Sequence, residues 1–142
     1  NYCTANPNST GAAGSMSADG SPTVAQNDLS LTASALPANS FGFFITSRMQ
    51  GFAATPGGSQ GNLCLGGAIG RFVAPGQVKS SGAGSEITLS TAASEWSLGA
   101  LPGPTGSSAA MVGDTANFQA WHRDANPTVT SNFSEGITVT WQ

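Results

Sequence analysis

Residues 118–127, FQAWHRDANP, bring together side chains that could do chemistry in a chain that otherwise avoids charge. They include the only histidine, His122, followed directly by Arg123 and Asp124. A histidine next to a carboxylate is the pairing used in general acid–base and nucleophilic catalysis. The same residues also serve structure, because Arg offers a rigid fork of donors at a strand end and Asp caps a following turn.

A nucleophile motif is the strongest catalytic signal to weigh. Residues 57–61, GGSQG, match G-x-S-x-G, and Ser59, Asp114 and His122 follow the Ser–Asp–His order of α/β-hydrolases. That motif works on a strained turn between a strand and a helix in a large parallel sheet. Here Pro56 precedes it, a short strand follows, and abundant Gly and Ser make a chance match easy. We interpret GGSQG as a hairpin loop and expect no catalytic residues.

The acidic residues indicate neither a glycosidase nor an EF-hand. A glycosidase needs two carboxyl groups at a set separation, whereas Glu86, Glu95 and Glu135 are scattered along the chain. No EF-hand spacing is present, and two Cys with one His are too few for a zinc site. We expect no cofactor, with a structural calcium ion as the alternative, because aspartates border predicted loops. The calcium candidates are Asp19, Asp28, Asp114 and Asp124.

Charge is unusually scarce. The chain has 142 residues, which suits a single domain over 1–142, and 39% of them are hydrophobic. Only 8% are charged, against about 25% in ordinary domains. With four basic residues and a net charge of −3, the chain lacks the basic footprint that nucleic acids and anionic membranes require. No apolar run approaches the ~20 residues of a membrane span, so we expect no membrane insertion.

The two cysteines, Cys3 and Cys64, form an even count in a chain whose hydroxyl-rich, lysine-poor composition fits an extracellular setting. An even count of this kind suggests one disulfide, and two free buried thiols are the alternative. A bond between them would close a long loop and, in the chain-entropy model, stabilise the protein by about 4 kcal/mol.

Hydrophobic residues recur with period two, which is typical of half-buried strands. In residues 29–35, for example, Leu and Ala alternate with Ser and Thr. Turn signals separate such runs, no window offers a capped helix, and residues 99–114 read as a loop crossing between sheets. The pattern predicts an all-β fold, a single antiparallel β-sandwich of jelly-roll or immunoglobulin type. Strands are predicted at 13–19, 29–35, 41–49, 62–65, 69–73, 86–90, 94–98, 116–123 and 137–141.

Alternation within the predicted strand 116–123 separates its side chains into two sets. Phe118, Ala120 and His122 share one face, and Trp121 with Arg123 shares the other. We favour a structural interpretation in which His122 lies at the rim of the sheet as a polar-tipped side chain that fills space. Contact of Trp121, His122 or Arg123 with a ligand is the alternative.

Five segments resemble a known family by their order along nearly the whole chain: YCTANPNSTG, DLSLTASALPANSFGFF, NLCLGGAIGRF, ANFQAWHRD and FSEGITVTW. They are similar to a β-rich domain at the C-terminal ends of many secreted planctomycete and myxobacterial proteins. There a Tyr-Cys opens the module, and the second Cys lies in a Leu-Cys-(Leu/Val)-Gly-Gly segment followed by an Arg. The resemblance implies secretion from a bacterium and a Cys3–Cys64 pairing. The family has no established biochemical activity, so the resemblance implies little about function. This chain departs from the pattern at His122, where an aromatic is commoner, which argues against a shared catalytic histidine.

Poorly guarded strand edges favour a structural role. Soluble β proteins protect their edges with Lys, Pro or inward charges, but this chain has one lysine, Lys79. Such edges accept another strand by β-augmentation, and residues 1–14 read as an extended linker or donor segment. We therefore expect a non-catalytic extracellular module for assembly or surface anchoring, such as a filament or sheath subunit whose partner is another copy.

The alternative function is a carbohydrate-binding module of a secreted protein. Sugars are bound by exposed aromatic platforms beside amides and arginines, and the partner would be an extracellular surface or polysaccharide. The candidate ligand-contacting residues are Tyr2, Trp96, Trp121 and Phe133. Asn8 and Asn132 also match the glycosylation acceptor pattern, which matters only in a host that glycosylates.

Overall fold

The structure is a computed structural model that describes residues 1–125 and 127–142. In that part of the chain the only helical elements are short 3₁₀ turns, so the predicted all-β class is confirmed. The elements are β1 (Ser15–Gly20), η1 (Val24–Gln26), β2 (Leu29–Ser34), β3 (Phe41–Ser47), β4 (Met49–Ala54), η2 (Pro56–Gly58), β5 (Asn62–Gly66), β6 (Gly70–Arg71), β7 (Lys79–Ser80), β8 (Ile87–Ser90), η3 (Leu98–Ala100), β9 (Leu101–Pro102), β10 (Ser107–Ser108), β11 (Thr115–Ala125), β12 (Val129–Phe133) and β13 (Ile137–Thr140).

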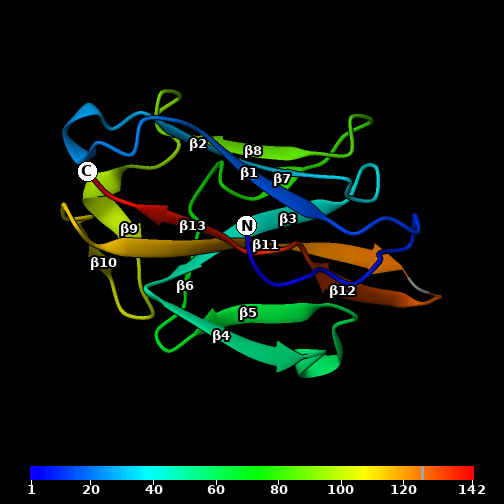
Figure 1. Ribbon diagram of the computed structural model, residues 1–142. Coiled ribbons are helices and arrows are strands. Elements are labelled where there is room, and N and C mark those ends of the chain that lie inside the picture. The colour runs from blue at the N-terminus through cyan, green and yellow to red at the C-terminus, as the bar shows by residue number, and fades with distance from the viewer. Residues whose placement is uncertain (126) are drawn as a thin grey trace.

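The strands lie in three layers (Figure 1). A sheet of order β1-β2-β8 forms one layer, at the top of the picture. The large sheet in the middle has the order β12-β11-β3-β6, with β13 beside β11 and β7 beside β3. The β4–β5 hairpin lies below it. The first two layers form the predicted antiparallel sandwich, and the hairpin is a third layer that the sequence did not predict.

The main core fills the space between the β1-β2-β8 sheet and the large sheet. Strand β2 buries every second residue, as its alternating sequence requires, and Leu31 and Ala33 have no exposed surface. Aromatic rings meet them from the large sheet and its loops. Phe118 packs edge-on against Trp96 and Trp141, with ring centroids 5.9 Å and 6.3 Å apart. Such edge-to-face contacts add stabilisation beyond the apolar area they bury.

Strand β11 is buried on both faces because a layer covers each side of it. Phe118 and Ala120 face the main core, as the alternation predicted. Trp121 faces the hairpin, where it packs against a second cluster formed by Ile45, Leu65 and Phe133. Strand β3 pairs with β11 in register and supplies residues to both cores. The two hydrophobic cores therefore share their central strands.

The predicted strand 69–73 is shortened to β6, and two further predicted strands differ because tertiary contacts redirect the backbone. The run 41–49 is interrupted at Arg48, where the chain leaves the large sheet and enters the hairpin. The Ser47 hydroxyl stabilises this change by donating to the Gly66 carbonyl at 2.6 Å and accepting from the Met49 amide at 3.1 Å. The sequence alone predicted a single, largely buried strand there.

The predicted strand 94–98 is a turn followed by η3. Trp96 and Leu98 are nevertheless buried, which is why the segment alternates like a strand. Their backbone is held by tertiary bonds, since the Asn27 side-chain oxygen accepts from the Leu98 amide at 2.8 Å. The expected loop 99–114 contains the small β9–β10 hairpin, and β12 was missed because its residues are mostly polar.

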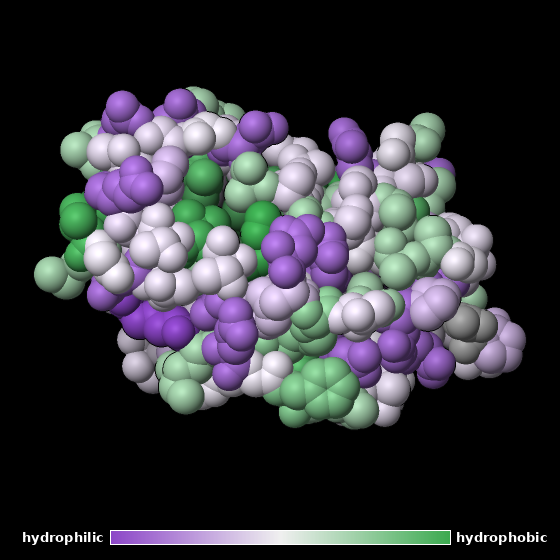
Figure 2. All heavy atoms as spheres, in the orientation of Figure 1, coloured by the Kyte–Doolittle hydropathy of each residue, from purple (hydrophilic) through white to green (hydrophobic). Residues whose placement is uncertain are grey.

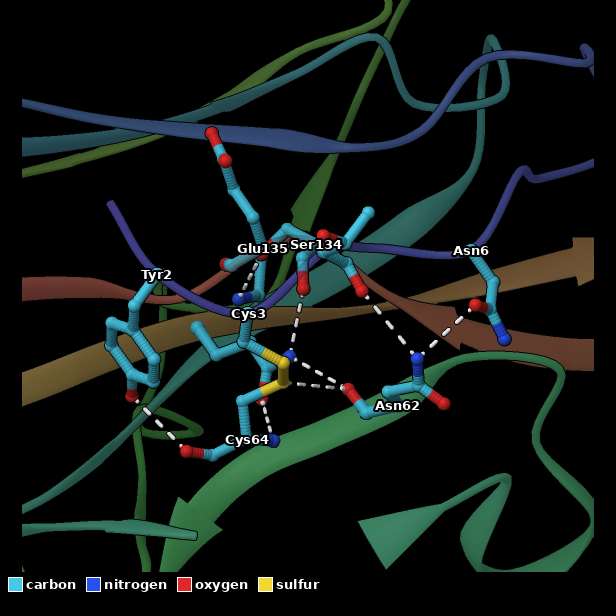
Figure 3. The surroundings of a disulfide bond; sticks show 10 residues. Tyr2, Cys3, Asn6, Asn62, Cys64, Ser134 and Glu135 are labelled. Atoms are coloured by element: carbon cyan, nitrogen blue, oxygen red, sulfur yellow. Dashed lines mark hydrogen bonds between the residues drawn. A yellow bond between two sulfur atoms is a disulfide. The ribbon is translucent and has the colours of Figure 1, made fainter. Parts of the chain in front are cut away.

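The N-terminal segment lies across its own chain. Tyr2 and Gly136 exchange two backbone hydrogen bonds of 2.9 Å, and Cys3 forms the predicted disulfide with Cys64 of β5. Figure 3 shows Tyr2, Cys3 and Asn6 facing Cys64 and Asn62 across this bond. The disulfide indicates a non-reducing environment.

Further along, Asn8 is almost completely buried, and its side-chain amide donates to the Ala35 carbonyl at 2.7 Å. Residues 1–14 therefore do not extend away from the protein, as a linker or donor segment would. To act as a donor strand, the segment would have to leave these contacts while Cys3 stays bonded to Cys64.

Removing the disulfide is expected to destabilise the protein through its unfolded state. The Cys3→Ala/Cys64→Ala double variant frees a long loop, for which the chain-entropy model gives a loss of about 4 kcal/mol. Urea unfolding of both proteins, with and without reductant, measures the difference. The reductant should affect only the wild type, and equal midpoints for the oxidised wild type and the variant would contradict this account.

Candidate functional site

An aromatic row crosses the large sheet on the face turned toward the hairpin. In the strand register Phe133 of β12 pairs with Trp121 of β11, and Trp121 pairs with Phe43 of β3. Neighbouring strands lie about 4.8 Å apart, so paired side chains on one face touch. Trp121 and Phe43 are stacked, with ring centroids 5.0 Å apart and planes inclined by 30°. Both rings are only half-buried.

This row forms the floor of a groove of about 320 Å³, which we call the aromatic groove. The hairpin strand β5 and the η2 turn contribute to its walls. Arg71 of β6 pairs with Ile45 of β3, which places its side chain on the same face as the aromatic row. The lining residues are Phe43, Ile45, Pro56, Gly57, Leu63, Ile69, Arg71, Trp121 and Phe133.

Arg71 is the only charged residue of the aromatic groove, and it is exposed. Ion pairs in the described part of the chain join Arg48 to Asp114 and Lys79 to Glu95, and neither includes Arg71. A flat apolar floor beside an unpaired guanidinium suits a ring that carries an anionic group.

Two of the four aromatic residues predicted to contact a ligand meet in this groove, Trp121 and Phe133. Trp96 does not, because it is buried in the main core and its indole donates to the Leu89 carbonyl at 3.2 Å. Tyr2 is half-buried over Gly136, and its hydroxyl donates to the Cys64 carbonyl at 3.1 Å. Burial raises the pKa of Tyr2 to about 12.

The sequence reasoning missed two groove residues, Phe43 and Arg71. The period-two pattern places Phe43 on the same face as Ile45, which was the available signal. The partner of Arg71 across the sheet could not be read from the sequence, since β6 is only two residues long.

The outer strand of the hairpin is a second unusual surface. Strand β4, MQGFAA, carries no charged residue, and five of its six residues are exposed. Met49 and Phe52 are 61% and 70% exposed, although both are large and apolar. Figure 2 shows hydrophobic atoms at the lower margin of the molecule, where β4 lies in Figure 1. In the described residues β4 pairs only with β5, so its other edge is open. We call this surface the β4 edge.

The predicted polar cluster is divided between the interior and the surface. His122 does not lie at a rim, as the sequence suggested, but is completely buried. The reason is that β8 of the opposite sheet covers the β3–β11 pair there, with Ile87 beside Gly42 and His122. Its Nδ1 lies 3.1 Å from the Arg123 carbonyl, while Nε2 has no partner in the described structure. Burial lowers the pKa of His122, and the Arg123 carbonyl and Asp124 charge offset only part of this effect.

Asp124 anchors the N-terminal segment. Its carboxylate accepts from the Ser9 amide at 3.0 Å, the Ala125 amide at 2.8 Å and the Asn132 side chain at 3.4 Å. Burial opposes ionisation of Asp124, but these hydrogen bonds outweigh it and keep its pKa below the ordinary value. Arg123 is exposed and forms no ion pair with any described residue. The turn expected after Asp124 includes Asn126, which lies outside the described residues.

The residues of the hydrolase-like pattern do not meet. Ser59 is buried and donates to the Ser131 carbonyl at 2.9 Å, and Asp114 is paired with Arg48. Asp114 precedes β11 and His122 lies near its other end, eight residues later. At about 3.3 Å per residue the two are roughly 26 Å apart.

The remaining acidic candidates do not form a metal site in the described structure. Within residues 1–125 and 127–142 no group of three or more His, Cys, Asp or Glu side chains converges on a metal position. Asp114 and Asp124 are engaged as described. Asp19 lies near the end of β1, and Asp28 directly precedes β2. Glu95 binds Lys79, whereas Glu135 accepts from the Met16 amide at 3.0 Å.

The two glycosylation patterns fall on buried asparagines. The side-chain amide of Asn8 donates to the Ala35 carbonyl, and that of Asn132 donates to the Pro7 carbonyl at 3.2 Å. Neither amide is accessible to a glycosyltransferase in the folded chain.

Compared with known proteins, the chain matches no family model, no curated protein and no solved structure. None of the helices described in it has the length and apolar character needed to cross a membrane.

Acidification is expected to destabilise the fold through His122. Burial lowers the pKa of His122 below the ordinary 6.5. The unfolded chain therefore binds a proton at this side chain more tightly than the folded chain does. This contribution to stability is complete above about pH 6.5 and falls at lower pH by up to about 1.4 kcal/mol per pH unit. Urea midpoints at about pH 7.5 and about pH 5 measure the loss.

The His122→Phe variant is the control, since it removes the titrating group and keeps a buried ring. Its stability should change much less over the same range. Asp124 does not affect this comparison. Because its pKa is lowered, the stability that its ionised carboxylate contributes is lost only below about pH 4. An equal pH dependence in wild type and variant would contradict the assignment to His122.

Proposed function

We propose that this chain is a non-catalytic extracellular structural module that assembles with further copies of itself through the β4 edge. The observation that carries the proposal is that β4 is an uncharged, largely exposed strand with one open edge. Natural sheets normally protect such edges with charges or prolines. Here the open amide and carbonyl groups lie beside Met49 and Phe52, so a docking strand gains both hydrogen bonds and apolar burial.

The edge strand β1 is better protected at its start than β4 is. The start of β1 is covered, because the Glu135 carboxylate accepts from the Met16 amide and the Asn1 side chain donates to the Met16 carbonyl at 2.8 Å. A change of register between Gln50 and Ala53 shows that β4 is irregular at its centre. Because a bulge disrupts the ladder locally, docking there would be short and would rely on the exposed Phe52 side chain.

The low charge of the molecule supports association. With a net charge of −3 and 8% charged residues, two copies repel each other only weakly at physiological salt. The disulfide fits an extracellular or cell-surface location. The resemblance to C-terminal domains of secreted bacterial proteins supports the same setting.

A second candidate function, polysaccharide binding, is favoured by one specific observation. The aromatic groove places half-buried Trp121 and Phe43 beside the unpaired Arg71. Binding sites for small ligands combine such an apolar floor with a few polar groups. The groove and the β4 edge lie on different strands of the hairpin, so one molecule has room for both activities.

The assembly proposal predicts that charging the β4 edge weakens self-association. The wild type should form oligomers or polymers at high concentration in sedimentation velocity and electron microscopy. Phe52→Lys should raise the dissociation constant about 10- to 100-fold, since burial of one Phe contributes about 1.5–3 kcal/mol.

Val112→Lys is the matched control, because Val112 is 74% exposed and lies in a turn outside the β4 edge. It introduces the same charge and should leave association unchanged. A monomeric wild type, or an equal effect of both substitutions, would overturn the proposal.

A further inference from the structure

We infer that the aromatic groove binds a negatively charged sugar, a hexuronate unit of an acidic polysaccharide. This inference rests on the second candidate function and specifies its ligand. The floor is the Phe133–Trp121–Phe43 row, and the polar group is the guanidinium of Arg71.

The aromatic row suits the apolar face of a sugar ring. Trp121 and Phe43 are stacked at 5.0 Å and held by the strand register, so the floor is preformed. Phe133 is buried beside them and supports Trp121 from β12. A groove of about 320 Å³ is at the small end of the roughly 300–1,000 Å³ of ligand sites, which favours a short stretch of sugar.

The positive charge of Arg71 favours acidic sugars over neutral ones. Arg71 is the only charged residue among those lining the groove, and no acidic residue lines it. Two of the other three basic residues are already engaged, Arg48 with Asp114 and Lys79 with Glu95. A guanidinium binds a carboxylate through two parallel, charge-assisted hydrogen bonds, and a neutral sugar has no negative charge to pair with it.

The position of Arg71 brings the cation to the edge of the floor. Ile45 and Phe43 share one face of β3, and Arg71 is the cross-strand partner of Ile45. Arg71 is therefore a diagonal neighbour of Phe43, within the reach of a long side chain. A ring stacked on Trp121 and Phe43 would direct a carboxylate substituent toward the guanidinium.

Tryptophan fluorescence reports this site selectively. Trp96 and Trp141 are 6% and 1% exposed in the main core, whereas Trp121 is half-buried in the groove. We expect trigalacturonate to change the emission in a saturable way and cellotriose to bind at least about tenfold more weakly. Because an exposed arginine–carboxylate pair is screened by salt, raising the ionic strength should reduce the difference.

Arg71→Gln tests the role of the cation, and Arg123→Gln is the matched control. Arg123 is also exposed and without an ion pair among the described residues, but it does not line the groove. The inference expects Arg71→Gln to weaken trigalacturonate binding about tenfold or more and to remove the preference over cellotriose, with Arg123→Gln unchanged.

These measurements distinguish carbohydrate binding in general from a specific preference for hexuronates. Equal binding of both sugars, unaffected by Arg71→Gln, would overturn the hexuronate assignment and leave carbohydrate binding intact. An equal loss of trigalacturonate affinity in both arginine variants would show that the overall charge of the protein attracts the sugar, and it would overturn the groove as the binding site. Binding of neither sugar, by fluorescence and by calorimetry, would overturn carbohydrate binding altogether, while the sedimentation result for the β4 edge would stand.

Discussion

The amide of Gln119 is the interaction on which the rest of the structure depends. Gln119 lies on the central strand β11, has no exposed surface and makes hydrogen bonds in three directions. It accepts from the Cys64 amide at 3.0 Å and donates to the carbonyls of Asn62 and Ser134 at 2.8 Å and 2.7 Å. An unpaired amide here would cost about 1–3 kcal/mol, so the hairpin and the β12–β13 connection must meet β11 at this point. The disulfide at Cys64 makes the same junction covalent.

Placing the hairpin across the large sheet creates both candidate surfaces. Leu63 of β5 becomes a wall of the aromatic groove, while β4 on the other side of the hairpin is left with an open edge. A two-stranded hairpin is marginal in isolation and needs a layer to pack against. Its burial on one side and exposure on the other therefore have one physical origin. This arrangement accounts for an apolar, uncharged strand that persists on the surface.

Charged side chains are scarce, and several of them have specific partners. Two of the four basic residues are paired with carboxylates, and the buried carboxylate of Asp124 is held by amides rather than by a cation. Most polar groups of the chain are hydroxyls and amides, which carry no charge and do not repel a second copy of the molecule. Arg71 differs from the paired basic residues, because its guanidinium lies in an apolar groove and is available to a ligand. The buried His122 has the opposite character, since its burial disfavours the protonated form of the ring.

The period-two pattern by itself determined the all-β class, the strands β1, β2, β8 and β13 and the two faces of β11, because alternation follows from strand geometry alone. The even cysteine count indicated the disulfide. Only the tertiary structure decided that His122 is buried and that Trp96 belongs to the core, because burial depends on which layer covers a face. It also decided that Phe133, Trp121 and Phe43 form one row. Their positions are set by the register of strands distant in sequence, which no local pattern encodes.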